Sequence, residues 1–468
     1  MTPNDPDALD LDAWRHHLGG LLRDRQVICA LAPLAAFVEW VALLESVGAR
    51  RPLLVASALG AGPVPRPEQA DVVLLDVPEA PSLTEEVRQQ DGVLRGRPSD
   101  LVRAVEAYDP GGTAVWLVTP FVGTAPLLGR DVVSGRPEEW LALEDKLVVD
   151  ALWDAVAAPR APIRAVPVET GRLREATAAL DEGAGVVWAG DTRDGLNGGG
   201  DFVRWVVTED DAAAAHRFFS RHCDRVRVMP FLEGVPCSIH GFVLPDGTAV
   251  FRPVELAILR GADRRFLLGG LGTTWDPPED DRAHMRDLAQ RTGERLRDLV
   301  GYRGAFGIDG ILTVDGFRPT ELNTRLSAGI VCLARAVDPV LFTLLQFNLL
   351  AGRDPQVPAT ALEEWALPVM DEARFTRPSA MSGRHVVSEP WQVDVAWDGP
   401  TLVRASEPTG WSVFAGPNAA GTFCRLVTPP GPAPGERVAG LNAALLEFLD
   451  AELGTGFGEV SVAPDVRR

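Results

Sequence analysis

Four polar residues near the middle of the chain have the types and spacing needed for phosphoryl chemistry. These are Asp309, Glu321, Asn323 and Arg325. Alternate residues of a strand share a face, so we expect Glu321, Asn323 and Arg325 to point the same way. Carboxylate and amide oxygens suit a Mg2+ ion that also binds substrate phosphates, and an arginine can bind phosphate or carboxylate through two parallel hydrogen bonds.

Whether Asp309 joins this set depends on the turn between its strand and the next, around Asp315-Gly316. A two-residue loop at Asp315-Gly316 would pair Asp309 with Leu322 and put it on the other face. A loop of odd length, for example with a bulge, would pair Asp309 with Asn323 or Glu321. We predict the odd-length loop.

A second candidate element is the glycine-rich loop from Asp194 to Gly200. Consecutive glycines let backbone N–H groups approach an anionic phosphate closely. Such a loop is also a common structural turn between two strands, and its position upstream of the acidic residues favours the phosphate-binding interpretation.

The chain of 468 residues has 45 basic residues, and Lys146 is its one lysine. A compositional bias that replaces lysine by arginine explains this count in part. Lysine and arginine are not interchangeable where a compact ammonium is needed. We therefore treat Lys146 as a candidate functional residue.

The overall composition excludes several classes of function. A net charge of -20 argues against nucleic acid or an anionic membrane as a partner. We find no apolar run of the ~20 residues that span a bilayer and no secretion signal at the start. The five cysteines lack CxxC spacing, which fits a reducing cytoplasm and argues against zinc or disulfide frameworks.

The elements expected around these residues are of two kinds. The first 120 or so residues alternate apolar strands with amphipathic helices, which predicts a Rossmann-like parallel sheet. Ala30-Leu31-Ala32-Pro33 replaces the glycine fingerprint of a dinucleotide site, which argues against a redox dehydrogenase. Beyond residue 138 we expect a helix carrying Asp145-Lys146, then antiparallel strands, a helix over 281–300 and a β-rich C-terminal portion. Among these strands are 248–255, 305–314 and 318–326.

Taken together, these motifs resemble those of the ATP-grasp superfamily, in the same order along the chain. The resemblance covers about residues 120 to 350 and rests on Asp145-Lys146, the glycine-rich loop, the segment from Met229 to Gly234, Gly307 to Gly310 and Glu321 to Arg325. It implies an α/β and α+β fold, with a Rossmann-like domain at 1–135 and an ATP-grasp domain at 136–355. The latter would carry a mobile lid at about 160–228, and a C-terminal α/β portion would follow at 356–468.

The resemblance also implies roles for individual residues. Asp309, Glu321 and Asn323 resemble the ligands of Mg2+, of which two ions are expected and for which Mn2+ can substitute. Arg325 resembles the catalytic residue that steadies the transferred phosphate, and Glu255 is a candidate for substrate binding, with an ordinary strand-end carboxylate as the alternative. Apart from the resemblance, the charge of Arg260 makes it a candidate for binding a carboxylate substrate, with a solvated surface arginine as the alternative. The residues expected to bind the nucleotide are Lys146, Gly198, Gly199, Gly200, Met229, Phe231, Leu232 and Glu233.

The chain departs from the superfamily pattern in two places. The strand before the glycine-rich loop has Val187-Trp188-Ala189 and lacks the second nucleotide-binding lysine. Either Arg193 or Arg204 replaces its charge, or the backbone amides of the loop suffice. Thr324 stands where proline is common.

The implied activity is that of a cytoplasmic biosynthetic ligase. It would use ATP to join a small-molecule carboxylate to an amine through an acylphosphate, and a homodimer is possible. Alternatives are another acceptor (a thiol, bicarbonate or kinase-type transfer) and a nucleotide-binding regulator without catalysis.

Overall fold

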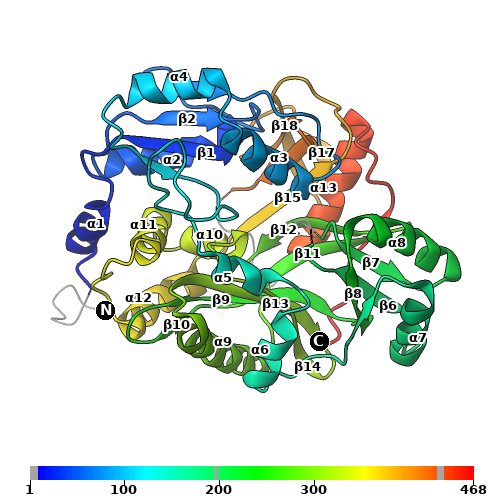
Figure 1. The fold of residues 1–468 in the computed structure, drawn as a ribbon. Coiled ribbons are helices and arrows are strands. Elements are labelled where there is room, and N and C mark those ends of the chain that lie inside the picture. The colour runs from blue at the N-terminus through cyan, green and yellow to red at the C-terminus, as the bar shows by residue number, and fades with distance from the viewer. Residues whose placement is uncertain (1–8, 194, 196–197, 199, 430–436, 468) are drawn as a thin grey trace.

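The computed structural model describes residues 9–467 except 194, 196–197, 199 and 430–436. Three sheets organise the described chain (Figure 1). A parallel sheet forms the N-terminal domain, a small antiparallel sheet forms one side of the molecule, and a twelve-stranded sheet runs between them into the C-terminal portion.

The N-terminal domain has the predicted parallel sheet with helices on it. Its strand order is β3-β2-β1-β4, and every neighbouring pair is parallel. The apolar run Val27–Ala32 forms the central strand because strands covered on both faces are apolar throughout. The elements are α1 (Leu11–Gly19), β1 (Val27–Ala32), α2 (Phe37–Ser46), β2 (Leu53–Ala56), β3 (Asp71–Leu74), α3 (Leu83–Arg95), α4 (Ser99–Tyr108) and β4 (Val115–Leu117).

A connecting segment leads to the small antiparallel sheet, whose order is β5-β8-β6-β7. Thr208 and Asp211 form a capping box at the start of its second helix, α8. The elements are α5 (Glu138–Leu141), a 3-10 turn (Ala142–Glu144), α6 (Val149–Ala155), β5 (Arg164–Pro167), α7 (Thr170–Leu180), β6 (Val186–Gly190), β7 (Val203–Val206), α8 (Glu209–His222) and β8 (Arg225–Pro230).

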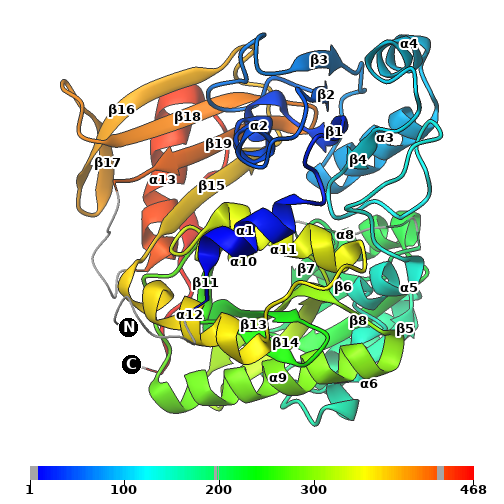
Figure 2. The ribbon, with the colours of Figure 1, turned by 90° about the vertical axis from the view of Figure 1, so that its left-hand side faces the viewer.

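The large sheet has the order β14-β13-β9-β11-β12-β15-β19-β18-β16-β17, with β10 on β9 and β20 on β11. The C-terminal strands therefore extend the central sheet instead of forming a sheet of their own (Figure 2). Its first strands and helices are β9 (Val235–Val243), β10 (Thr248–Val250), β11 (Val254–Gly261), β12 (Phe266–Gly272), α9 (Glu279–Val300), β13 (Gly304–Thr313) and β14 (Gly316–Asn323). The rest are α10 (Ala328–Ala334), α11 (Pro339–Leu350), α12 (Ala359–Glu372), β15 (Thr376–Ser382), β16 (Trp391–Asp398), β17 (Thr401–Arg404), β18 (Trp411–Asn418), β19 (Gly421–Val427), α13 (Val438–Leu453) and β20 (Val460–Ser461).

Helices cover both faces of this sheet. Met285 and Leu288 of α9 pack against Ile239 and Ile308 on one face. On the other face, Val254 and Ala305 belong to a core that also contains residues of α1, α2, α10 and α11. The N-terminal domain is thereby attached to the face of the sheet that carries Asp309. In the described part of the chain no helix is long and apolar enough to cross a membrane.

Three sequence-based boundaries were wrong. The expected strand over 248–255 is two strands, β10 and β11, and Pro253, which has no N–H to donate, lies in the gap between them. The strand expected over 318–326 ends at Asn323. Asp145 and Lys146 lie in the turn between the 3-10 turn and α6, because helical geometry stops at Glu144 and resumes at Val149.

A buried ion pair joins the small sheet to the rest of the molecule. Arg227 of β8 donates to both carboxylate oxygens of Asp150 in α6, at 2.9 and 2.8 Å, and to the carbonyl of Thr320, at 3.2 Å. The exposed fractions of the two side chains are 3% and 10%. The small sheet is therefore fixed to the hairpin that carries Glu321.

We expect Asp150→Ala to lower the free energy of unfolding by about 3–5 kcal/mol, because it leaves the Arg227 guanidinium buried without a counter-charge. Urea denaturation measures this change. Asp154→Ala, on the exposed side of the same helix, removes a solvated pair with Arg160 and should stay within error of the parent. Equal losses in the two variants would contradict the assignment.

Candidate functional site

Asp309 and Glu321 face each other across β13 and β14. The hairpin turns through two residues, since Thr313 pairs with Gly316, and the predicted odd-length loop was wrong. A bulge at Thr320 then shifts the register, so that Gly310 pairs with Pro319 but Asp309 pairs with Glu321. The prediction that Asp309 pairs with Glu321 or Asn323 is confirmed, by a bulge within the strand rather than at the turn.

The two carboxylates and Asn323 form one cluster of oxygen atoms. Nδ2 of Asn323 donates to Oδ2 of Asp309 at 2.8 Å, while Oδ1 of Asn323 is buried without a partner. A buried oxygen without a partner is costly, and here it lies beside two carboxylates. This donor set fits Mg2+, which takes few protein oxygens and completes its coordination with water and phosphate.

Burial and the neighbouring Glu321 raise the pKa of Asp309 to about 7. The Nζ atom of Lys146 lies 3.1 Å from Oε1 of Glu321, with 10% of the lysine side chain exposed. The one lysine of the chain therefore supplies positive charge to this crowded carboxylate pair.

Glu144, two residues before Lys146, holds Arg325. Its Oε2 atom pairs with Nη1 of Arg325, and its Oε1 atom accepts from Nη1 of the buried Arg136 at 2.6 Å. The segment 144–146 thus pairs with both Glu321 and Arg325. Because β14 ends at Asn323, strand alternation does not fix the direction of Arg325, and these contacts set its position instead.

The guanidinium of Arg325 also lies 4.9 Å from the ring centroid of Phe121, which follows β4. The aromatic face and Glu144 together limit its movement. Glu144, Arg136 and Phe121 were missed by the sequence reasoning. Adjacency to Lys146 was a signal for Glu144, whereas no local signal marks Arg136 or Phe121.

His240 on β9 contacts residues next to the same region. It lies within hydrogen-bond distance of Ser238 (2.7 Å) and of Ser327 (3.2 Å), the residue before α10. Burial lowers the pKa of His240 to about 3, so the ring is neutral. It connects β9 to the segment that follows Arg325.

The glycine-rich loop lies between β6 and β7, and its described residues contact the N-terminal domain. Gly198 exchanges two hydrogen bonds of 3.0 Å with the hydroxyl of Thr84, at the start of α3. The Thr84 N–H donates to Asp201 at 3.2 Å, and Gly200 is exposed. Gly199 lies outside the described residues.

The segment from Met229 to Glu233, which we term the hinge, connects β8 to β9. Met229 is buried, the ring of Phe231 stacks on Trp205 with centroids 4.4 Å apart, and Leu232 is half-buried. Glu233 pairs with Arg260, whose Nη1 atom lies 3.1 Å from Oε2 of Glu233. The structure thus places Arg260 at the hinge, where its guanidinium lies 4.9 Å from the ring centroid of Phe231.

Glu255 does not belong to this site. It pairs with Cys237 of β9, whereas Asp309 pairs with the adjacent Ser238, so the two acids lie on opposite faces of the sheet. Its carboxylate accepts from Arg437 and, at 2.8 Å, from the N–H of Val438 at the start of α13. Glu255, a candidate for substrate binding, therefore lies on the face away from Asp309, and its burial is explained by these contacts.

The two arginines considered as substitutes for a second lysine have contacts within the small sheet and its helices. Arg204 donates to the carbonyls of Asp201 and Val203 and lies 4.0 Å from the ring centroid of Phe218. Arg193 donates to the carbonyl of Arg221 at 2.6 Å. These contacts orient both guanidinium groups without a nucleotide.

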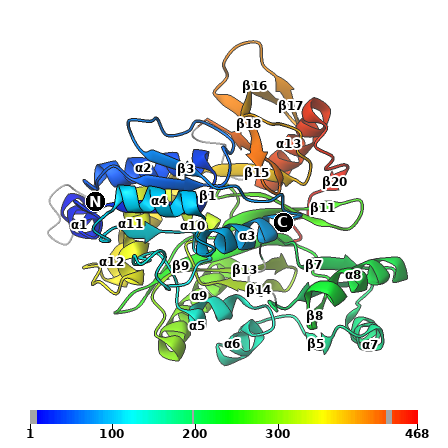
Figure 3. The same cartoon turned by 45° about the horizontal axis from the view of Figure 1, so that its top comes forward.

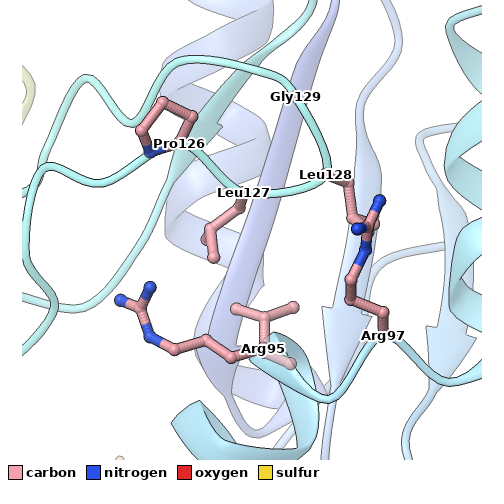
Figure 4. A pocket seen from close by; sticks show the side chains of 7 residues that line it. Arg95, Arg97, Pro126, Leu127, Leu128 and Gly129 are labelled. Carbon is pink, nitrogen blue, oxygen red and sulfur yellow. The ribbon is translucent and has the colours of Figure 1, made fainter.

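A surface pocket of about 230 Å3 lies elsewhere, between the end of α3 and the loop 126–129 (Figure 4). Arg95, which lines it, already pairs with Asp91 at 2.9 Å. None of the residues discussed above lines this pocket.

Comparison with solved structures assigns the fold. The biotin carboxylase of Campylobacter jejuni in an ATP-analogue complex superposes with a TM-score of 0.56 and 14% identity, covering 96% of this chain and 94% of that one. The biotin carboxylase domain of the Hydrogenobacter thermophilus 2-oxoglutarate carboxylase gives 0.55 and 13%, over 94% and 91%. The chain has an ATP-grasp fold. Carboxyaminoimidazole ribonucleotide synthase from Aspergillus clavatus gives 0.50 and 11%, over 94% and 100%.

No protein-family model matches the sequence, and no curated protein matches it either. The ATP-grasp assignment therefore rests on the backbone arrangement, and at these identities it concerns the fold alone.

We expect Asp309→Asn to raise the melting temperature in metal-free buffer, and to raise it more at pH 8 than at pH 5. The raised pKa of Asp309 means that the folded protein binds this proton more tightly than the unfolded one. Stability is therefore lost as the pH rises from ~4 towards ~7, and it then levels off. The asparagine removes this loss, so a gain that is equal at both pH values would contradict the assigned cause.

Proposed function

We propose that this protein is an ATP- and Mg2+-dependent ligase that joins a small-molecule carboxylate to an amine, releasing ADP and phosphate. The observation that carries the proposal is the cluster of Asp309, Glu321 and Asn323. Lys146 pairs with Glu321, and Glu144, two residues before Lys146, holds Arg325. Phosphoryl transfer depends on positioning and charge neutralisation, and these side chains supply both.

Each part of the cluster has a distinct task in this proposal. The oxygens of Asp309, Glu321 and Asn323 would hold Mg2+, which neutralises charge on the phosphates when bound. Lys146 exchanges Glu321 for a phosphate oxygen. Arg325, held by Glu144 and Phe121, binds the phosphoryl group as it passes to the substrate carboxylate.

The nucleotide would lie between the hinge and this cluster. Strand β9 begins beside the hinge and places Ser238, four residues after Gly234, against Asp309, which is a distance of ~13 Å along the strand. The base would contact the backbone near Phe231 and Leu232, and Glu233 would lie near the ribose. The glycine-rich loop would then cover the phosphates from the side of α3.

Closure of that loop also protects the reaction. An acylphosphate is hydrolysed if water reaches it, and an enclosed site prevents this side reaction. The Thr84–Gly198 contacts support a role for the N-terminal domain in holding the loop closed.

We expect Glu321→Ala to reduce ADP release by ~100-fold when candidate carboxylates and amines are supplied, because the Mg2+ that would neutralise the phosphate charge loses one of its ligands. Glu139→Ala, an exposed change on α5, should retain full turnover. Undiminished turnover in Glu321→Ala would reject the proposed site. ATP binding without turnover on any substrate panel would favour the regulator, and turnover with thiols or bicarbonate but no amine would favour a different acceptor.

We expect Lys146→Arg to lose ~100-fold in ATP turnover while its melting temperature stays close to that of the parent protein. A planar guanidinium cannot replace a compact ammonium beside Glu321 at a position that is 8% exposed. A coupled ADP assay and a thermal melt measure the two quantities. Activity equal to that of the parent protein would indicate that compositional bias alone explains this lysine.

A further inference from the structure

Two arginines of the C-terminal strands project from one face of the large sheet. Arg425 of β19 lies in the row next to that of Arg377 of β15, because Ser379 pairs with Arg425 and alternate residues share a face. Both arginines are half-buried, while Ala380 and Cys424 on the other face are buried in a core that includes residues of α13. The arginine face is therefore the one that lies away from α13.

This face is turned towards the N-terminal domain, as Figure 3 shows for the blue and orange segments. A methyl group added to Gly62, which follows β2, would lie 2.6 Å from Nη2 of Arg425. The N–H of Ala80 donates to the carbonyl of Ala419 at 2.9 Å. The Arg425 guanidinium thus lies where the carboxyl end of the parallel sheet meets the C-terminal strands.

A third arginine reaches the same place from α10. The guanidinium of Arg335 lies 5.3 Å from the ring centroid of Phe375, two residues before Arg377 and on the same face. The side of this group nearest the sheet is closed by Phe414, which pairs with Arg425 and lies 5.2 Å from its guanidinium. Three separate elements therefore bring arginines together.

Their charge is not compensated within the described chain. No carboxylate lies within 4.0 Å of any of the three guanidinium groups, and none of them donates a hydrogen bond to a described residue. Nε of Arg425 is buried without a partner. Burial lowers the pKa of Arg425, the charges of Arg377 and Arg335 lower it further, and Glu39 of α2 opposes this effect.

Other buried arginines of the chain are treated differently. Arg136, Arg227 and Arg252 each pair with a carboxylate. Arg377 and Arg425 are half-buried and Arg335 is exposed, so the three like charges face an opening that an anion can enter and where it would offset their repulsion.

Helix α10, which leads from Arg325 to Arg335, indicates the length of such a ligand. Helix α10 begins three residues after Arg325 and ends next to Arg335, and its seven residues rise ~10 Å. The carboxyl ends of parallel strands, where β2 meets Arg425, are the edge at which such sheets bind ligands.

We propose that Arg335, Arg377 and Arg425 bind an oxyanion of the acceptor substrate, a carboxylate or phosphate, and that helix α10 separates this group from the segment of Arg325. Guanidinium groups bind both anions through paired hydrogen bonds. The identification of the ligand as the acceptor substrate rests on the proposed function, whereas the anion site itself rests on the three arginines.

The test is calorimetric titration of the full chain with inorganic phosphate and, in a separate arm, with succinate. We expect saturable binding of at least one of them, weakened tenfold or more in Arg335→Gln, which alters an exposed residue, and in the Arg377→Gln, Arg425→Gln double variant. The arm that binds more tightly identifies phosphate or carboxylate as the preferred group. Arg404→Gln, an exposed arginine of β17, should bind as the parent protein does.

Further arms separate this site from the proposed ATP site. Arg325→Gln should leave the phosphate or succinate affinity within a factor of two, and the arginine variants should bind MgADP as the parent does. If the anion affinity falls in Arg325→Gln but not in the arginine variants, the anion binds at the transfer site and the proposal is overturned. Absence of binding, or binding equal in all variants, marks an adventitious ion only and also overturns it. Arginine-dependent anion binding in a protein that does not bind ATP would support the anion site and reject the proposed function.

Discussion

Asp309 and Glu321 stand opposite each other on adjacent antiparallel strands, and like charges in that position repel. The repulsion, together with burial, raises the pKa of Asp309 and makes this pair a source of instability in the free protein. Much of the surrounding structure compensates for it. Asn323 donates to one carboxylate and Lys146 pairs with the other.

The compensation extends outward through further charges. Lys146 lies on the same short segment as Glu144, which holds Arg325 and Arg136, and Asp145 accepts from Thr192 at 2.7 Å. Thr320 is the bulge residue that sets the pairing of Asp309 with Glu321. Its carbonyl accepts a hydrogen bond from Arg227, which is itself held by Asp150. The small antiparallel sheet, the segment 144–146 and the hairpin of β13 and β14 are therefore linked through charged groups around one site.

The continuous large sheet explains how distant parts of the chain reach that site. β13 and β14 lie at one edge of the sheet, and β15 to β19 extend it towards the N-terminal domain. Because α10 follows directly after Arg325 and ends beside Phe375, the segment beyond the site leads to the C-terminal strands. This arrangement places the Arg335, Arg377 and Arg425 group within reach of a substrate that reacts near Arg325.

Local sequence determined the parts of this protein that depend on short-range rules. Alternating apolar segments predicted the parallel sheet, and period-two alternation put Glu321 and Asn323 on one face. The motif order predicted the ATP-grasp fold, and the count of one lysine singled out Lys146.

Tertiary structure alone decided which distant groups meet. The bulge at Thr320 set the Asp309–Glu321 pairing, Arg136 reached Glu144, and Glu255 turned to the opposite face. Register and long-range ion pairs depend on how whole elements pack, and a shift of one residue reverses every side chain of a strand.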